Sequence, residues 1–165
     1  LKQAKGNLAI VMDLDETILD NSKYQVERSE LNLGFTQESW SAWVKRKEAG
    51  LTPGAKEFLS KARSFPIRIV FISNRMNDNL QPTRANLTDL GVLSPSDLFL
   101  LRKNKSDTKE KRRAEVLKGT GRMSKVGPLK VIAYFGDAMG DFPKRAEKDF
   151  GETNFILPNP MYGKW

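Results

Sequence analysis

Short apolar runs recur along the chain, and polar or amphipathic segments separate them. The runs are continuous rather than alternating, and β-branched residues are common in them. Strands that are buried on both faces, as in a parallel sheet, have this pattern. We therefore expect strands at Leu8–Met12, Ile67–Ile72, Leu98–Leu101, Val131–Phe135 and Phe155–Leu157.

Three amphipathic segments lie between these runs. The first begins at Thr52-Pro53, an N-cap followed by a proline, which the first helical position accepts. The second begins at Pro82 and ends at Gly91, and the third is capped by Ser106 or Asp107. The side chains that we expect on the inner faces are Phe58, Leu59 and Ala62 in the first and Leu87 and Leu90 in the second. In the third we expect Ala114, Val116 and Leu117 to be partly buried.

Residues 20–51 interrupt this alternation. Trp40, Trp43 and Val44 have the spacing of one helical face, and Thr36 is the expected cap of that short helix. Strands alternating with helices predict an α/β fold with a doubly wound, Rossmann-like parallel sheet, in a single domain over residues 1–165. We expect residues 20–51 to be a small helical and loop insertion over the carboxyl edge of the sheet, where open α/β sheets bind ligands.

Composition limits the chemistry. The chain has 165 residues and contains neither cysteine nor histidine, so a cysteine nucleophile, a histidine base and a His/Cys zinc site are excluded. The net charge of +8 suits phosphorylated substrates or a polyanionic partner, and it equally suits a solvated basic surface. The basic residues cluster in 102–125 without interleaved aromatics, which does not favour stacking on single-stranded nucleic acid.

Polar residues follow four of the expected strands. They are Asp13-Leu14-Asp15-Glu16-Thr17 after the first, Ser73-Asn74-Arg75 after the second, Lys103, Lys105 and Lys109 after the third, and the segment 136–141 after the fourth. Because the carboxyl ends of parallel strands meet at one edge of a sheet, these residues should form one site.

The first of these groups needs a positive partner. Asp13, Asp15 and Glu16 repel one another unless a cation binds them. Without histidine or cysteine nearby, a carboxylate can act as a nucleophile toward phosphorus, and a second carboxylate can protonate the leaving oxygen. Mg²⁺, a lysine and a serine hydroxyl would neutralise the phosphoryl oxygens. The sequence therefore predicts phosphoryl chemistry at a magnesium site.

The same residues resemble a known family. Asp13-x-Asp15-x-Thr17, Ser73, a downstream lysine and Gly136-Asp137-x-x-x-Asp141 are similar to the four ordered motifs of the haloacid-dehalogenase-like phosphatases. Within that superfamily the segments "DLDETILDNSKYQ", "SW..WV", "TPGAKEFL", "FISNR", "KSDTKEKRR", "GDAMGDF" and "LPNPMYGKW" look like the bacterial class C acid phosphatases, also known as the lipoprotein acid phosphatase or 5′-nucleotidase group. The resemblance covers nearly the whole chain.

The resemblance implies a role for each matching residue. Asp13 would be the nucleophile and a Mg²⁺ ligand, and Asp15 the acid/base, which also gives its backbone carbonyl to the metal. Asp137 would complete the protein ligands. Three groups of further residues are implied: Ser73, Asn74 and Lys109 for the phosphate, Asp141, Arg75 and Thr17 in support, and Trp40, Tyr162 and Tyr24 for the leaving group, with Asn159 close by. Lys109 fits the family pattern of Lys, two residues, Arg, and Lys105 remains the alternative.

The predicted function is a Mg²⁺-dependent phosphomonoesterase that acts on nucleoside monophosphates or aryl phosphates. The alternatives are a phosphoserine protein phosphatase of the same superfamily and a non-catalytic basic module that binds RNA or anions. The resemblance also implies an extracytoplasmic location, a possible homodimer and no stable nucleic-acid partner. The chain departs from the family pattern in its short bridge, Phe142–Asn154, between the fourth motif and the LPN segment. It begins at Leu1, which fits a processed or trimmed chain.

Overall fold

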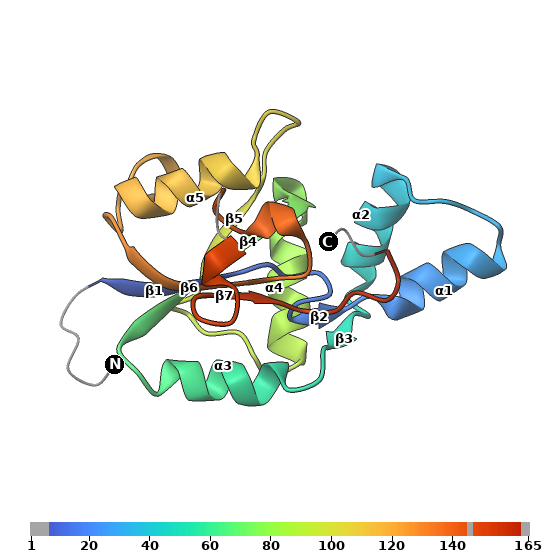
Figure 1. Cartoon of the computed structure of the whole chain (residues 1–165). Coiled ribbons are helices and arrows are strands. Elements are labelled where there is room, and N and C mark those ends of the chain that lie inside the picture. Colours follow the sequence, from blue (N-terminus) through green and yellow to red (C-terminus); the bar gives the residue numbers. More distant parts are fainter. Residues whose placement is uncertain (1–6, 145–146, 163–165) are drawn as a thin grey trace.

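A five-stranded parallel sheet forms the centre of the molecule (Figure 1). The computed structural model describes residues 7–144 and 147–162. The strand order is β5-β4-β1-β6-β7, and every neighbouring pair is parallel. The strands are β1 (Leu8–Met12), β4 (Ile67–Met76), β5 (Leu98–Arg102), β6 (Lys130–Gly136) and β7 (Asn154–Ile156). The predicted α/β fold and its five strands are confirmed.

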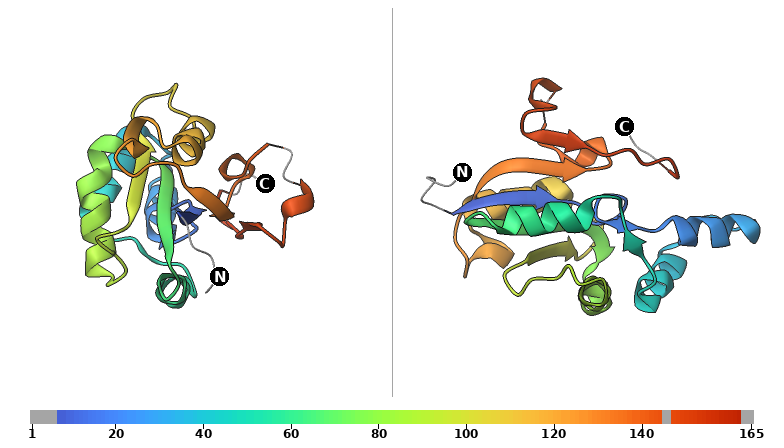
Figure 2. Two further views of the ribbon diagram at one scale, coloured as in Figure 1. Left: turned by 90° about the vertical axis from the view of Figure 1, so that its left-hand side faces the viewer. Right: turned by 90° about the horizontal axis from the view of Figure 1, so that it is seen from below.

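Helices cover both faces of this sheet. Figure 1 shows α5 (Lys109–Lys118) above the sheet and α3 (Ala55–Arg63) below it, and Figure 2 shows α4 (Leu80–Asp89) on the side away from α5. Each helix follows one strand and leads to the next, as parallel strands require. Short 3-10 turns complete the layers: η1 (Asn77–Asn79), η2 (Gly121–Met123), η3 (Met139–Asp141) and η4 (Glu147–Asp149).

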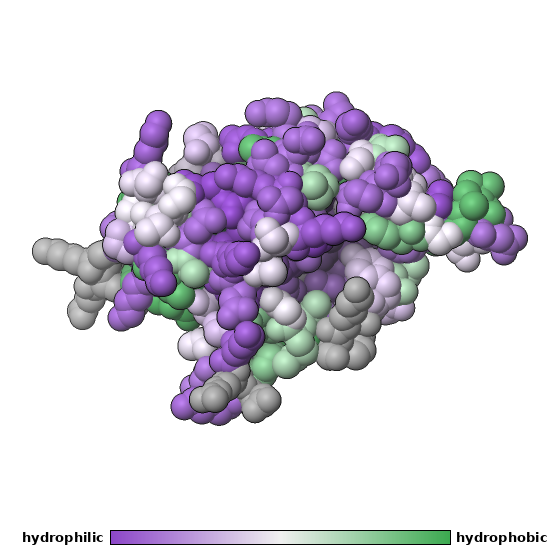
Figure 3. Space-filling model, turned by 90° about the horizontal axis from the view of Figure 1, so that it is seen from above, coloured by the Kyte–Doolittle hydropathy of each residue, from purple (hydrophilic) through white to green (hydrophobic). Residues whose placement is uncertain are grey.

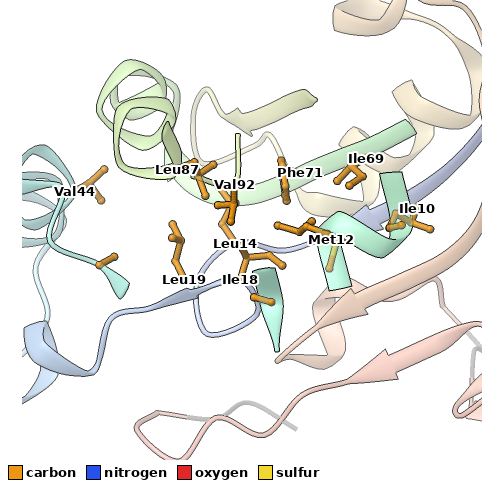
Figure 4. Close-up of a cluster of buried hydrophobic side chains, with 14 of the residues drawn as sticks. Ile10, Met12, Leu14, Ile18, Leu19, Val44, Ile69, Phe71, Leu87 and Val92 are labelled. Atoms are coloured by element: carbon orange, nitrogen blue, oxygen red, sulfur yellow. The ribbon is translucent and has the colours of Figure 1, made fainter. Parts of the chain in front are cut away.

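The strand β1 divides the core into two clusters because its side chains alternate between the two faces. Ile10 and Met12 point into the larger cluster with α3 and α4, which Figure 4 shows. Ala9 and Val11 belong to the smaller cluster under α5, together with Val116. All five residues of β1 are buried, so the central strand is covered on both faces as its apolar run predicted.

The insertion leaves and re-enters the fold through a small ribbon. β2 (Leu19–Asp20) and β3 (Gly50–Leu51) pair antiparallel, and α1 (Ser22–Glu30) and α2 (Gln37–Arg46) lie between them. In Figure 1 these helices project beyond the carboxyl ends of the sheet strands. Thr36 caps α2 as predicted: its hydroxyl accepts from the backbone N–H of Ser39, and the Ser39 side chain bonds back.

All three predicted helix starts differ from the structure by one to three residues. α3 begins at Ala55 with Gly54 as its N-cap, where φ is 78° and a glycine is favoured. The Thr52 hydroxyl instead donates to the carbonyl of Thr17, 2.8 Å away, and ties the ribbon to the loop after β1. The cap of α5 is Thr108, whose hydroxyl accepts from the N–H of Lys111.

The faces of the three helices also differ in part from the prediction. Leu59, Ala62, Leu87 and Val116 are buried as expected. Phe58 is 37% exposed and lies against Phe135, with 4.8 Å between the ring centroids. Leu117 is 48% exposed, because Arg112 and Arg113 occupy buried positions of α5 instead. The helix α4 begins at Leu80, two residues before Pro82.

No helix in residues 7–144 and 147–162 is long and apolar enough to cross a membrane.

The packing of α3 on the sheet yields a prediction. Leu59 is fully buried, so Leu59→Ala should lower the free energy of unfolding by roughly 2–5 kcal/mol through lost transfer energy and a residual cavity. Urea denaturation of both proteins measures this difference. Leu31→Ala, at a leucine that is 66% exposed, is the matched control and should change stability by no more than about 0.5 kcal/mol. Equal losses in the two variants would contradict the assigned core.

Candidate active site

Four buried polar side chains gather at the carboxyl ends of neighbouring strands. Asp13 follows β1, Ser73 lies near the end of β4, and Asp137 and Asp141 follow β6. One carboxylate oxygen from each of Asp13, Asp137 and Asp141 lies within 4.8 Å of the others. The backbone N–H of Asp13 donates to the carbonyl of Phe135 at 2.9 Å, which continues the β1–β6 pairing into the site. The sheet therefore brings the first and fourth motifs together.

Lys109 supplies the positive charge beside these carboxylates. It is the first residue of α5, and its side chain is 11% exposed. Its ammonium lies 2.8 Å from Oδ1 of Asp13 and donates to Oδ1 of Asp141. Lys103 and Lys105 are exposed, and within the described residues neither forms an ion pair. The structure therefore places Lys109, and not Lys105, in the site.

Burial and mutual repulsion dominate the electrostatics of the site. Burial raises the pKa of Asp13 well above its usual value, and Asp141 and Asp15 add to this effect, whereas Lys109 opposes it. Burial also raises the pKa of Asp137. Burial disfavours the ammonium of Lys109, but Asp13 and Asp141 outweigh it, so that the pKa of Lys109 is raised. One lysine must therefore balance several carboxylates.

A hard cation would fit this set of ligands. Oδ1 of Asp13 is buried, and the ammonium of Lys109, 2.8 Å away, is its only charged partner among the described residues. Three clustered carboxylates beside a single ammonium favour a divalent cation with oxygen ligands. The sequence-based ligands Asp13 and Asp137 are both in this cluster, and Asp141 is closer to it than its supporting role implied.

Asp15 is held by donors of Arg75, Asn21 and Ser73 rather than by the cluster. Its Oδ1 accepts from Nε of Arg75 at 2.9 Å, from Nη2 of Arg75 at 2.7 Å and from Nδ2 of Asn21 at 3.0 Å. Its Oδ2 has only longer contacts, at 3.2 Å, with Ser73 and with Nε of Arg75. Oδ2 is therefore the less firmly bound oxygen of this carboxylate.

A second arginine holds the loop after β4. Arg112 is fully buried, and its Nη1 donates to the carbonyls of Ser73 and Leu100. Its Nη2 donates to Oδ1 of Asn74 at 2.7 Å, which leaves the Asn74 amide group as the free end of that side chain. Arg112 thus orients two of the three residues that the resemblance assigns to the phosphate, Ser73 and Asn74.

Gly136 is required by the close approach of Asp141. A Cβ at position 136 would lie 2.3 Å from Oδ2 of Asp141. The same oxygen accepts from the N–H of Ala138 at 3.1 Å, which fixes the turn η3 against the end of β6. A glycine is therefore required sterically at position 136, the last residue of β6, whereas Asp137 after it contributes a negative charge.

The three aromatic residues assigned to the leaving group have different environments. Tyr24 is 3% exposed, its hydroxyl bonds to Ser39, and its ring packs between Trp40 and Trp43. Tyr24 is therefore a core residue of the insertion, and its assignment to substrate binding is wrong. Trp40 is 7% exposed, with Cζ of Arg75 5.8 Å from its ring centroid.

The segment 159–162 closes one side of the site. Asn159 is buried and donates to Oδ2 of Asp137 at 2.7 Å. The hydroxyl of Tyr162 donates to Oε2 of Glu16, and Tyr162 itself is 39% exposed. Oε1 of Glu16 accepts from the N–H of Asn21 at 3.0 Å. Burial, with the charge of Asp15, raises the pKa of Glu16 to about 8.

Sequence reasoning gave no role to three residues that shape the site. Asn21 is fully buried and connects Asp15 to the indole N–H of Trp43. Arg112 was used only as a spacing marker, and Glu16 only as a third negative charge. Each lies inside a quoted motif, which is a signal for importance but not for a particular contact. Thr17 is buried with its hydroxyl unpartnered, and it contacts Thr52 through its backbone carbonyl.

Comparison with known proteins gives a consistent result. The sequence pattern of the family described as "HAD superfamily, subfamily IIIB (Acid phosphatase)" matches residues 1–165. The structure is similar to the class C acid phosphatase from Bacillus anthracis, with a TM-score of 0.79 and 32% identity, over 98% of this chain and 70% of that chain. A tungstate-bound structure of that enzyme matches equally, at 33% identity. The stem 31 kDa glycoprotein of Glycine max is 26% identical over 98% of this chain, which spans 61% of the length of that protein.

Glu16 provides a test of the electrostatics. Its folded-state pKa of about 8 lies above the unfolded value of 4.5, so its contribution to stability is fully present below about pH 4.5 and is lost as the pH rises to about 8. Glu16→Gln removes this titration. In EDTA, the free energy of unfolding of the variant, relative to that of the unmodified protein, should therefore increase by roughly 1–3 kcal/mol between pH 5 and pH 8. Urea unfolding measures this difference. Glu30→Gln, at an exposed glutamate, is the control, and parallel pH curves for Glu16→Gln and the unmodified protein would contradict the assignment.

Proposed function

The chain belongs to the acid phosphatases of subfamily IIIB of the HAD superfamily, and on this premise we propose that it is a Mg²⁺-dependent phosphomonoesterase. The observation that carries the proposal is the cluster of Asp13, Asp137 and Asp141 around one buried lysine. Carboxylates at the ends of parallel strands are placed to receive a ligand from solvent. A lysine and a cation beside a carboxylate nucleophile suit a phosphoryl group better than a neutral substrate.

In the proposed first step, a carboxylate oxygen of Asp13 attacks the phosphorus. The bond from phosphorus to the leaving oxygen breaks, and that oxygen takes a proton from Asp15. Oδ2 of Asp15 suits this transfer because its contacts are the longer ones. The ammonium of Lys109, the Asn74 amide and the Ser73 hydroxyl are the donors assigned to the phosphoryl oxygens.

In the second step, a water molecule attacks the phosphorus of the aspartyl-phosphate and passes a proton to Asp15. Phosphate leaves, and Asp13 and Asp15 return to their starting states. The network of Arg75, Asn21 and Ser73 holds Asp15 in place through both transfers. The acid/base of both steps is therefore positioned by contacts from β4 and from Asn21.

The metal would be held by carboxylates of this chain. Asp13 and Asp137 are the assigned side-chain ligands, with the backbone carbonyl of Asp15 by resemblance, and Asp141 lies within reach of the same ion. When bound, Mg²⁺ supplies positive charge that neutralises the anionic nucleophile and phosphoryl oxygens. Lys109 and Asn159 orient Asp13, Asp141 and Asp137 around that position.

Nucleoside monophosphates or aryl phosphates are the proposed substrates. Tyr162 is the exposed aromatic residue of the closing segment, and a planar leaving group can stack on its ring. Trp40, also assigned to the leaving group by resemblance, is 7% exposed and packs against Tyr24 and Phe35, so it offers a substrate little surface. On the resemblance alone, we also propose an extracytoplasmic location and a homodimer.

The rival functions have weaker support. A phosphoserine protein phosphatase would use the same carboxylates, and it is distinguished by its turnover of phosphopeptides. The buried arginines argue against a basic module that binds RNA. Arg75, Arg112 and Arg113 are each at most 7% exposed, so they contribute little to the positive surface that a nucleic acid would contact.

The nucleophile provides the main test. Asp13→Asn should lower kcat for para-nitrophenyl phosphate and for a 5′-nucleotide by roughly three orders of magnitude or more, because the attacking carboxylate is gone. Its fold should persist, since the change also relieves carboxylate repulsion, and circular dichroism checks this. Asp89→Asn, at an exposed aspartate at the end of α4, is the control and should keep full activity. Retained turnover in Asp13→Asn would refute the mechanism.

Metal binding can be tested without turnover. At a Mg²⁺ concentration about 100 times its Kd, the Tm of the unmodified protein should rise by roughly 5–10 °C, because the ion binds only the folded state. Asp137→Asn should lose most of this increase, whereas Asp89→Asn should keep it. Differential scanning calorimetry with Mg²⁺ and with EDTA measures both. An undiminished increase in Asp137→Asn would remove Asp137 from the ligands.

A further inference from the structure

A cavity of about 540 Å³ opens beside the site, and no residue of the insertion lines it. Its walls come from the end of β4, the segment 102–108, the first turns of α5 and the segment 138–144. Figure 3 shows this face, on which hydrophilic side chains gather over α5 and η3. Lys109 and Asp141 belong both to the cavity and to the site, whereas Asp13 and Asp137 do not line the cavity. The cavity is therefore a neighbouring space that shares one wall with the reacting groups.

The charges along the cavity are not balanced. Its carboxylates all have cationic partners: Asp107 pairs with Arg122, Glu110 with Lys144, and Asp141 with Lys109. Two cations remain. Among the described residues, neither Arg102 nor Arg113 has a carboxylate within ion-pair distance. The cavity therefore has two guanidinium groups whose charge no carboxylate of the described chain neutralises directly.

Arg113 is the more unusual of the two, because it is only 7% exposed. Its one hydrogen bond within the described residues runs from Nη1 to the carbonyl of Gly140, at 2.8 Å. Burial lowers its pKa, and the nearby groups that oppose this effect are Tyr134, Asp141 and Glu110. A buried guanidinium without a paired anion is costly, so an anion that enters the cavity would be bound favourably.

Arg102 is the last residue of β5, lines the same cavity and is half-buried. Its Nε and Nη2 donate to the carbonyls of Asn104 and Lys105, at 3.1 and 3.2 Å. These bonds hold the guanidinium at the rim and leave Nη1 without a partner among the described residues. Guanidinium groups bind phosphate through several parallel donors, and two held in place lose little entropy on binding.

We propose that this cavity binds a second phosphate group, carried by the leaving part of the substrate. The proposal rests on the proposed phosphatase function, because the reacting phosphate would contact Lys109 on the shared wall. The second phosphate would extend past Asn74, which lines the cavity, toward Arg102 and Arg113, while a planar base would remain on the side of Tyr162. The preferred substrates are then phosphomonoesters with a further anionic group, and not the simple monoester.

The test compares two nucleotides that differ only in the second phosphate. Release of the 5′-phosphate from adenosine 3′,5′-bisphosphate and from 5′-AMP is followed by chromatography of the products. The unmodified protein should show a kcat/KM about tenfold higher for the bisphosphate, as expected for added charge-assisted hydrogen bonds. Arg102→Gln should reduce this ratio at least about fivefold. Lys118→Gln, the same change of charge at the exposed end of α5, should leave the ratio as in the unmodified protein.

A second measurement keeps the proposal separate from catalysis. In the Asp13→Asn background, calorimetry should give a lower Kd for the bisphosphate than for 5′-AMP, and Arg102→Gln should remove the difference. Arg113→Lys should weaken bisphosphate binding less than Arg113→Gln, because it keeps the buried charge. Equal Kd values, or a preference that survives Arg102→Gln, would overturn the second phosphate site. No phosphate release from any monoester, with the binding difference intact, would instead overturn the phosphatase function alone.

Discussion

The contact of Lys109 with two carboxylates is the interaction on which the rest of the site depends. Asp13 and Asp141 are buried within 4.8 Å of each other and of Asp137, and the charges of Asp13 and Asp141 meet at a single ammonium. The lysine reaches them because it is the first residue of α5, and the Thr108 cap fixes where that helix begins. A shift of the helix start by one residue would rotate the ammonium by about 100° around the helix axis, away from the carboxylates. A local hydrogen bond at the helix start therefore determines the charge balance of the site.

Arginines with little exposure form a second layer beneath these groups. Arg75 holds Asp15, and Arg112 holds the backbone of Ser73 and the amide side chain of Asn74. Both arginines come from segments that also carry reacting groups, so the same residues that anchor the loops to the sheet orient the functional side chains. A guanidinium suits this use because it has five donors in a fixed plane and remains charged when buried. Some of the basic residues of the chain therefore hold other residues in place and do not contribute to a basic surface.

The sheet, and the edge on which the site lies, could be predicted from the sequence because both depend on local pattern. The run Leu8–Met12 is buried along its whole length, as a continuous apolar strand at the centre of a sheet must be. The helix starts were predicted less accurately from the sequence. Thr52 looked like a cap, but its hydroxyl bonds to the carbonyl of Thr17, a contact between segments 35 residues apart. Tyr24 was misassigned and Asn21 was overlooked for the same reason: their partners lie in α2 and β4, and spacing along the chain does not encode these contacts.

The position of residues 159–162 determines when the site is completed during synthesis. Asn159 bonds to Asp137 and Tyr162 bonds to Glu16, so the last described residues contact groups that follow the fourth motif and the first strand. During translation these residues leave the ribosome after every other part of the described fold. The sheet can pair and the carboxylates can gather before that moment, but one wall of the site is still missing. A nascent chain would therefore hold these carboxylates in an open cleft until this segment emerges and closes it.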